Sequence, residues 1–590
     1  VASFINHGSI KWMTMWLAAA STSSSSSSSS TTPTTTPIRL QAPHPEMTPS
    51  QRLYDLSQVC CRGDEDIKTT PTVTVPNLNQ WDTYGDYTLS KDESFLRMFE
   101  HIIADEFGFE DAVFMPSGVM GQSIALLIHH QKHYQEQQKK DTSSEQSNLG
   151  SHCNHRHRRK AFACHPTCHL LLHEENGYNE LCGFDVLPIV DSSSSSLSSP
   201  SPINDNNNNN DDEDNNSKSI GLNGSPLRYD HLIDTIMKDR RRRNNNNNDN
   251  SNKIGDDDNP TANKDNKDNK HHQDDDNDPV SWDDDVSTLI VELPHRELGG
   301  KITPWDDIQK IRQYLDDTEE QRQHHNHHKV AFHCDGARIF EATTAYYSND
   351  DDDDDNNNNN SDSRVSTLRD LSEPFDSMYI SFYKGLGGFA GGMLLGNADF
   401  CTKARRMLRQ FGGNLYTLHP YIVSAWDGYQ RNWVIPNNNK NNHNDDNDVD
   451  EFYLLTFQEK KDKLVRIVTS ISSLSSFDMV GRFEPSIPQV PMVHVYLRPT
   501  VEECSKVRDE ILVEDNVCIF HRIRSVKEEE ENNPDNENDD DDDSVIQYRS
   551  MFELSIGQSN GAVPDELWIS SWKKFVERIV KTISSEHEEE

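Results

Sequence analysis

Long tracts of Asn and Asp interrupt this 590-residue sequence, and they constrain its fold more than any other feature. The tracts include "NDNNNNNDDEDNN" (204–216), "NDDDDDDNNNNNSDS" (349–363) and "KEEEENNPDNENDDDDDS" (527–544), and they hold much of a formal net charge of −42. Segments of this composition bury too little apolar surface to offset the entropy of ordering, so we expect disordered insertions. Because they separate segments with regular patterns, they read as loops within one core.

The remaining sequence predicts a large domain followed by a smaller one. About 360 residues of ordinary globular composition remain, which is enough for two such units. We expect the following ranges: a disordered or targeting tail at 1–50; a large domain at 51–436 with inserts near 135–158, 191–280 and 349–364; a disordered insert at 437–450; and a smaller domain at 451–590 with an insert near 527–544.

The large domain alternates apolar strands with helices. Apolar runs bounded by Gly and Pro and separated by helical patterns indicate a mostly parallel, buried sheet of the α/β class. We predict helices at 118–134, 229–239 and 304–317, and strands at 111–117, 160–166, 169–173, 184–190, 287–293, 329–335, 377–383 and 391–396.

The pattern changes after a long helical stretch at 451–474. Strands at 490–497, 517–523 and 551–557, together with a helix at 500–512, predict a βαββ-like unit. In the closing helix, Leu567, Trp568, Trp572, Phe575 and Ile579 share one face. We therefore expect a smaller α+β domain that packs on the first.

Composition limits the class of protein. The apolar run near the start is too short for a membrane span, and no other segment qualifies. We expect a cytoplasmic protein, with an organelle-targeting peptide at the start as the alternative. The sequence carries neither an extended basic face nor interleaved aromatic and basic residues, so we expect no nucleic-acid partner.

The ten cysteines lack regular spacing and indicate reduced thiols. The sequence "CNHRHRRKAFACHPTCH" gathers Cys153, Cys164 and Cys168 with His155, His157 and His169, but the spacing fits no familiar zinc pattern. We therefore expect no metal.

Ligands of open α/β sheets bind beyond the carboxyl ends of the strands. One such end carries "PSGVMG" (116–121), where backbone N–H groups at a helix start and the Ser117 hydroxyl suit a phosphate. An ordinary helix cap is the alternative. Another carries "CDGAR", where Asp335 ends an apolar strand and must pair either with Arg338 or with a cationic ligand.

Lys384 lies at a third strand end, directly before a run of glycines. Burial disfavours an ammonium, and an uncharged amine can form a Schiff base with an aldehyde. The glycines would let a bulky ligand approach the backbone. A surface lysine explains the charge but leaves the glycines unexplained. Near a fourth strand end, His169 can lie against a flat ring or be a satisfied core histidine.

Together these residues match what pyridoxal 5′-phosphate requires when it acts on an amino acid. The set contains a phosphate turn, an acid for the ring nitrogen, a Schiff-base lysine and an arginine for a carboxylate. The joint signal is much stronger than any one part.

The same segments resemble the threonine aldolase and aromatic amino acid β-eliminating lyase family, which are fold-type I enzymes dependent on pyridoxal phosphate. The resemblance spans roughly residues 80 to 425, in the expected order. The motifs that carry it are "DTYGD" (82–86), "FMPSGVMGQ", "CHPTCH", "VELPHRELGG" (291–300), "FHCDGARIFEA", "DSMYISFYKGLGG" and "FGGNLYTLHPYIVSA".

The resemblance implies a role for each matching residue. Lys384 would form the Schiff base, Asp335 would pair with the ring nitrogen, and His169 would stack on the ring. Ser117, Gly118 and Val119 would hold the phosphate, and Arg405, Arg406 or Arg409 is a candidate to approach it. Arg338 would bind the substrate carboxylate, and His295 would assist the aldol step. The resemblance also implies a homodimer or homotetramer, in which Tyr84 reaches a neighbour's site and contacts substrate.

Two positions depart from the family's pattern. Val119 replaces a threonine of the usual phosphate turn and lacks its hydroxyl. Glu553 stands near the place of a second carboxylate-binding arginine, for which Arg522 and Arg549 are candidate substitutes.

The expected reaction is aldol cleavage of a β-hydroxy-α-amino acid, such as threonine or allo-threonine, to glycine and an aldehyde. The alternatives are β-elimination or racemisation with the same cofactor, and a non-catalytic binding module that keeps the fold.

Overall fold

The computed structural model describes residues 36–45, 47–62, 94–144, 159–190, 224–252, 280–322, 329–347, 365–416, 418–439, 454–526 and 548–589. The Asn- and Asp-rich tracts at 204–216, 349–363 and 527–544 lie outside these residues, as do residues 440–451 and Tyr84. Three expected inserts contain helix. Helix α4 (Gly118–Ser144) extends into the range 135–158, α7 (Tyr229–Asn252) lies within the range 191–280, and α13 (Ile435–Asn439) extends into the range 437–450.

A seven-stranded sheet forms the centre of the large domain. In spatial order it contains β2 (Asp111–Met115), β8 (Gly392–Gly396), β7 (Ser377–Ser381), β6 (Ala331–Gly336), β5 (Val286–Glu292), β3 (Lys160–Cys164) and β4 (Phe184–Pro188). Strands β7, β6, β5, β3 and β4 pair in parallel, whereas β8 runs antiparallel to both of its neighbours. The α/β, mostly parallel prediction is confirmed.

Both faces of this sheet are buried. Along β2, Ala112 and Phe114 belong to one hydrophobic cluster, while Val113 and Met115 belong to another. This alternation places successive side chains on opposite faces, which explains the continuous apolar runs in the sequence.

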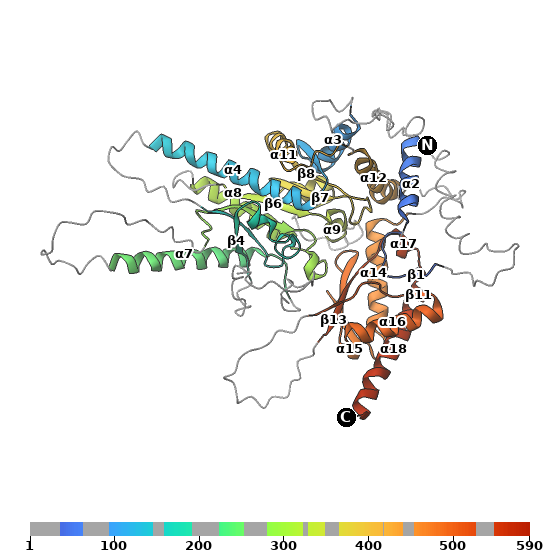
Figure 1. The fold of residues 1–590 in the computed structure, drawn as a ribbon. Helices are drawn as coiled ribbons and strands as arrows, with labels where there is room; N and C mark the ends of the chain where they lie inside the picture. The colour runs from blue at the N-terminus through green and yellow to red at the C-terminus, as the bar shows by residue number, and fades with distance from the viewer. Residues whose placement is uncertain are drawn as a thin grey trace, which may run out of the picture.

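Helices cover both faces (Figure 1). Ile124 of α4 (Gly118–Ser144) and Phe400 of α11 (Ala398–Gln410) pack in the cluster of Val113 and Met115. The cluster of Ala112 and Phe114 takes side chains from α3 (Phe95–Phe107), α7, α8 (Trp305–Arg322), α9 (Ile339–Tyr346), α10 (Leu368–Ser372) and α12 (His419–Tyr429).

The smaller domain has a four-stranded antiparallel sheet in the order β12 (Arg524–Ser525), β13 (Ser550–Ser555), β10 (Met492–Leu497) and β9 (Gly481–Glu484). Its helices include α14 (Phe457–Ser472), α16 (Val501–Asp515) and α18 (Asp565–Glu589). Trp568, Trp572 and Phe575 of α18 are buried in its core, as their shared helical face predicts. Figure 1 shows this domain, in orange and red, beside the large sheet.

Residues 36–45 differ from the expected tail. Strand β1 (Ile38–Arg39) pairs in parallel with β11 (Val517–Cys518), and Leu40 lies in the core of the smaller domain. The His44 ring hydrogen-bonds through Nε2 to the Lys384 carbonyl oxygen at 2.8 Å. This segment therefore contacts both domains.

Two strand predictions were wrong. Residues 169–173 were expected as a strand, but His169–Leu172 form the short helix α5. A carboxylate oxygen of Glu292 accepts a hydrogen bond from the His169 backbone N–H at 3.1 Å, so the chain turns at this point. The expected strand 517–523 is divided, because Val517–Cys518 pair with β1 while Arg524–Ser525 pair with β13.

No helix within the described ranges is long and apolar enough to cross a membrane. Over the same residues, no group of three or more His, Cys, Asp and Glu side chains is arranged to hold a metal ion. Cys153 and the two histidines that follow it in the clustered motif lie outside these ranges.

Candidate active site

A cavity of about 290 Å³ opens at the carboxyl ends of the parallel strands. It lies where β5, β6 and β7 end and where α4 begins. Its walls contain Pro116, Ser117, Gly118, Val119, Gln122, His169, Glu174, Glu292, Pro294, Arg296, Asp335, Ala337, Arg338, Tyr379, Tyr383, Lys384, Phe389 and Ala390. Seven of the residues selected from the sequence are in this set: Ser117, Gly118, Val119, His169, Asp335, Arg338 and Lys384.

The first turn of α4 forms one wall. The Ser117 side-chain oxygen accepts a hydrogen bond from the Met120 backbone N–H at 3.2 Å, and Val119 is 39% exposed. A Cβ atom added to Gly118 would lie 2.7 Å from the Tyr379 hydroxyl oxygen, so the turn packs closely on that ring. Helix N-termini bind anions through free N–H groups and the helix dipole, and this wall can hold a phosphate.

Two carboxyl groups stand side by side at the end of the sheet. Glu292 of β5 and Asp335 of β6 are paired in register, so their side chains lie on the same face. Asp335 is 3% exposed, and its burial together with the negative charge of Glu292 raises its pKa from 3.8 to about 7. A carboxyl group in this position favours a cationic partner.

Lys384 follows the end of β7 and reaches the cavity. Burial, together with the positive charges of Arg338 and Arg296, lowers its pKa from 10.5 to about 8. About a tenth of the amine is therefore uncharged at pH 7, far more than for an ordinary lysine, and the uncharged form is the one that attacks an aldehyde.

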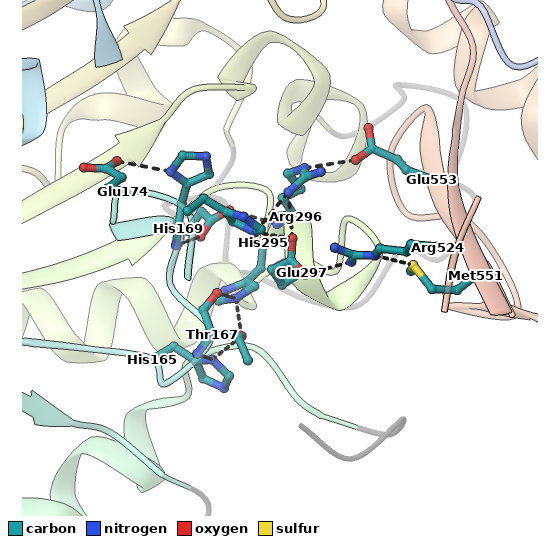
Figure 2. Close-up of polar contacts among 12 residues, drawn as sticks. His165, Thr167, His169, Glu174, His295, Arg296, Glu297, Arg524, Met551 and Glu553 are labelled. Atoms are coloured by element: carbon teal, nitrogen blue, oxygen red, sulfur yellow. Dashed lines mark hydrogen bonds and ion pairs between the residues drawn. The ribbon is translucent and has the colours of Figure 1, made fainter. Parts of the chain in front are cut away.

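His169 lies at the start of α5, where its Nδ1 is 3.1 Å from a carboxylate oxygen of Glu174 (Figure 2). Burial opposes protonation of this ring, but the hydrogen bond to Glu174 and the charge of Asp335 outweigh it, so the pKa of His169 is raised above 6.5. With a proton held on Nδ1, Nε2 is left as the proton acceptor of the neutral ring.

Arg338 and Arg296 lie on the side of the cavity nearest the smaller domain. One carboxylate, Glu553 of β13, bridges them: Oε1 accepts from Arg338 at 2.7 Å, and Oε2 accepts from Arg296 at 3.0 Å. Figure 2 shows Glu553 reaching the Arg296 guanidinium from the smaller domain. Although burial opposes ionisation, the two arginines lower the pKa of Glu553 to about 2, so it is a carboxylate at neutral pH.

His295 is not brought to the cavity wall. Its side chain is 2% exposed, and Nε2 lies 2.7 Å from the Thr167 hydroxyl oxygen, with the ring 4.8 Å from that of His165 (Figure 2). The family resemblance implied that His295 assists the aldol step, whereas in the structure its ring lies in a buried cluster with Thr167 and His165, beside the cavity.

The arginines named as candidates to approach the phosphate or to bind the substrate carboxylate also lie elsewhere. Arg405 pairs with Asp111 at 2.5 Å and with Glu100 at 3.2 Å, while Arg406 and Arg409 are exposed. Arg522 and Arg549 are exposed as well. None of these five arginines lines the cavity.

Sequence reasoning missed Gln122, Glu174, Glu292 and Arg296 as cavity residues. Glu292 and Arg296 lie within the motif "ELPHRE", in which the family resemblance implied a role for His295 only. The position of Glu292 near the end of the predicted strand 287–293 was a usable signal, because ligands bind beyond the carboxyl ends of such strands. No local sequence pattern indicated Glu174, which lies five residues beyond His169 and forms a hydrogen bond with the His169 ring.

Comparison with known proteins identifies the family of this chain. The sequence model of the β-eliminating lyase family matches residues 66–469. The chain belongs to this family. The matched range covers most of the chain and includes all seven cavity residues that were selected from the sequence for their chemistry.

Two curated relatives, both named as aldolases, are similar to part of the chain. The chain is 34% identical over 116 residues to the low specificity L-threonine aldolase of Escherichia coli O157:H7, and 29% identical over 134 residues to the aldolase vrtJ of Penicillium aethiopicum. These matches cover 20% and 22% of the chain, but only 26% and 27% of the relatives. The chain's match thus spans about a quarter of the length of these curated relatives.

A solved structure, a putative L-allo-threonine aldolase from Listeria monocytogenes EGD-E, has the same fold. The TM-score is 0.53 at 21% identity, and the alignment covers 92% of this chain and 96% of that one. This likeness covers both domains and supports the fold-type I architecture.

The cofactor of this β-eliminating lyase family member is pyridoxal 5′-phosphate. The residues present fit that group. Asp335, with its raised pKa, can ionise against the ring nitrogen, Lys384 supplies an amine, and the first turn of α4 supplies N–H donors. The Gln122 amide nitrogen is buried, lines the same cavity and has no hydrogen-bond partner among the described residues, so it offers a further donor.

Proposed function

We propose that this protein is a pyridoxal-phosphate-dependent lyase that cleaves a β-hydroxy-α-amino acid, such as threonine or allo-threonine, to glycine and an aldehyde. The observation that carries the proposal is the convergence of Lys384, Asp335, His169 and Arg338 with the first turn of α4 on one cavity. The names of the Escherichia coli and Listeria relatives support the substrate class.

The cofactor would be held by residues from four parts of the chain. Lys384 would hold it covalently, Asp335 would face the ring nitrogen, and His169 would cover one face of the ring. Ser117, Gly118 and Val119 would bind the phosphate, with backbone N–H groups carrying more of the interaction because Val119 has no hydroxyl. When bound, pyridoxal phosphate supplies an electron-accepting ring next to the substrate's α-carbon.

The chain's own residues then decide which bond breaks. Arg338 would bind the substrate's α-carboxylate and so orient the Cα–Cβ bond relative to the ring. His169 is better placed than His295 to accept the β-hydroxyl proton, since its ring lines the cavity and its Nδ1 is fixed by Glu174. Nε2 of His169 would receive that proton as the aldehyde leaves.

Product analysis tests the reaction. The purified protein, supplied with pyridoxal phosphate and allo-threonine, is expected to release glycine and acetaldehyde, and Lys384→Ala is expected to release neither. Pyruvate and ammonia from serine, with no glycine from allo-threonine, would replace aldol cleavage with β-elimination, the reaction for which the family is named. An unchanged substrate that only inverts at the α-carbon would indicate racemisation.

A pair of variants tests the proton acceptor. His169→Phe keeps a ring over the cofactor but removes Nε2, so we expect the visible cofactor band to persist while cleavage falls by about 100-fold or more. His295→Gln serves as the comparison. If cleavage is lost in His295→Gln and kept in His169→Phe, the assignment to His169 fails and the motif-based role of His295 stands.

We also propose a homodimer or homotetramer. Its mass can be measured by light scattering of the cofactor-bound protein, and a monomer with full activity would contradict it.

A further inference from the structure

The cavity holds an arrangement that neither the family motifs nor the proposed reaction explains. The smaller domain carries a glutamate where an arginine was expected, and that glutamate joins two arginines of the large domain. Oxygen Oε1 of Glu553 lies 2.7 Å from Arg338, and Oε2 lies 3.0 Å from Arg296. One carboxylate thus fits between two guanidinium groups that both line the cavity.

We propose that Arg296 and Arg338 together bind the substrate's α-carboxylate, and that Glu553 occupies this carboxylate position until the substrate displaces it. The inference rests on the proposed function, because it requires an α-amino acid substrate. It makes Arg296 the second carboxylate-binding arginine, supplied by the large domain.

The surrounding contacts favour exchange of one carboxylate for another. Arg338 keeps Glu341 at 3.0 Å, and Arg296 keeps Glu297 at 2.7 Å, so both guanidinium groups stay oriented when Glu553 leaves. Glu553 in turn keeps a donor on its own strand, because the Ser555 hydroxyl lies 3.2 Å from its Oε1. The displaced carboxylate is therefore not left without a partner.

The charges set the cost of this exchange. Both arginines are already paired with carboxylates, so a substrate must compete with an internal group that is ionised at neutral pH. An internal competitor at high effective concentration weakens binding of an equivalent external group. Glu553 therefore lowers the affinity for every α-amino acid and leaves amines without a carboxylate unaffected.

Ligand binding to the cofactor-bound protein tests the proposal. Glycine is titrated while the visible absorption band is followed, and methylamine, which is glycine without its carboxylate, is titrated in the same way. In Glu553→Gln we expect glycine to bind about tenfold or more tightly, as removal of one competing charge-assisted hydrogen bond predicts. The affinity for methylamine should not change.

A matched variant controls for loss of an interdomain ion pair. Glu484, on β9 of the same small sheet, pairs with Lys301 of the large domain at 2.6 Å and does not line the cavity. Glu484→Gln should leave the ratio of glycine to methylamine affinity at the wild-type value. Adding Arg296→Gln to Glu553→Gln should remove the gain in glycine affinity.

The outcomes separate the two proposals. Weaker or unchanged glycine binding in Glu553→Gln, with a normal cofactor band, overturns this inference and makes Glu553 a fixed support for the arginines. A gain that survives Arg296→Gln also overturns it. If Glu553→Gln does not fold, Glu553→Ala provides the same comparison. A wild-type protein that shows no cofactor band overturns the proposed function, and this inference with it.

Discussion

The cofactor-free protein should lose stability between pH 5 and pH 8 because of one side chain, Asp335. This carboxyl group ends β6, is 3% exposed and lies in register with Glu292 on the neighbouring strand. Burial and the charge of Glu292 raise its pKa from 3.8 to about 7. We expect the folded protein to retain this proton at a pH at which the unfolded chain has released it.

The sign and size of the effect follow from proton linkage. Between pH 3.8 and about 7 the unfolded chain binds fewer protons at Asp335 than the folded protein, so the free energy of unfolding falls as pH rises. The slope is about 1.4 kcal/mol per pH unit where it is fully developed. From pH 5 to pH 8 the full slope applies over roughly two units, which gives a loss of about 3 kcal/mol.

Denaturant unfolding of the cofactor-free protein at pH 5, 6, 7 and 8 measures this loss. Asp335→Asn removes the titrating group, so subtracting its profile from that of the wild type isolates the contribution of Asp335. Asp376→Asn is the control. Burial opposes ionisation there, but Arg312 lowers the pKa of Asp376 below 3.8, so its contribution should be constant above pH 5.

Parallel profiles for wild type and Asp335→Asn would refute the reasoning, because Asp335 would then be ionised in both states across the range. A wild-type protein that gains stability relative to Asp335→Asn as pH rises would reverse the sign and point to a cationic partner already present.

Three further predictions concern the cofactor. Borohydride trapping of pyridoxal phosphate on Lys384, mapped by mass spectrometry, should become faster as pH rises through about 8, because burial and the charge of Arg338 lower the pKa of Lys384 to about 8. Label on another lysine would contradict the assignment. Val119→Thr should add a hydroxyl donor and tighten cofactor binding about fivefold in a fluorescence titration, and weaker binding would show that the turn has no room for it. Gly118→Ala should weaken cofactor binding, since its Cβ would lie 2.7 Å from the Tyr379 hydroxyl oxygen; Tyr379→Phe in the same chain should restore part of the affinity, and no restoration would locate the clash elsewhere.

The sequence predicted the large sheet well because its signals are local. Apolar runs such as "STLIVEL" have the length of strands, and both sheet faces are covered, so these runs coincide with strands of the sheet, except the run at 169–173. Asp335 and Lys384 could be selected for the same reason, since residues that follow parallel strands meet at one edge. Local sequence therefore located the cavity and seven of the residues in its walls.

Features that depend on distant partners were not predictable in this way. The run "LLL" after His169 suits a strand or a helix equally, and a hydrogen bond from the His169 backbone N–H to Glu292, 123 residues away, accompanies the helix. Strand β1 is only two residues long and pairs with residues near position 517. The ion pair between Arg296 and Glu553 joins positions 257 residues apart, and no local pattern marks it.

The charges of the cavity suggest why the ligand-free fold tolerates so many ionisable groups. A proton on Asp335 stands where a pyridinium nitrogen would bring positive charge, and Glu553 stands where a substrate would bring a carboxylate. Each charge expected from a ligand thus has an internal substitute, so the buried groups are neutralised before anything binds. Binding then exchanges one neutralising partner for another, and the net change in buried charge is small. On this view the free energy of binding comes from the phosphate turn and the covalent link to Lys384, whereas Asp335 and Glu553 chiefly determine which ligands are accepted.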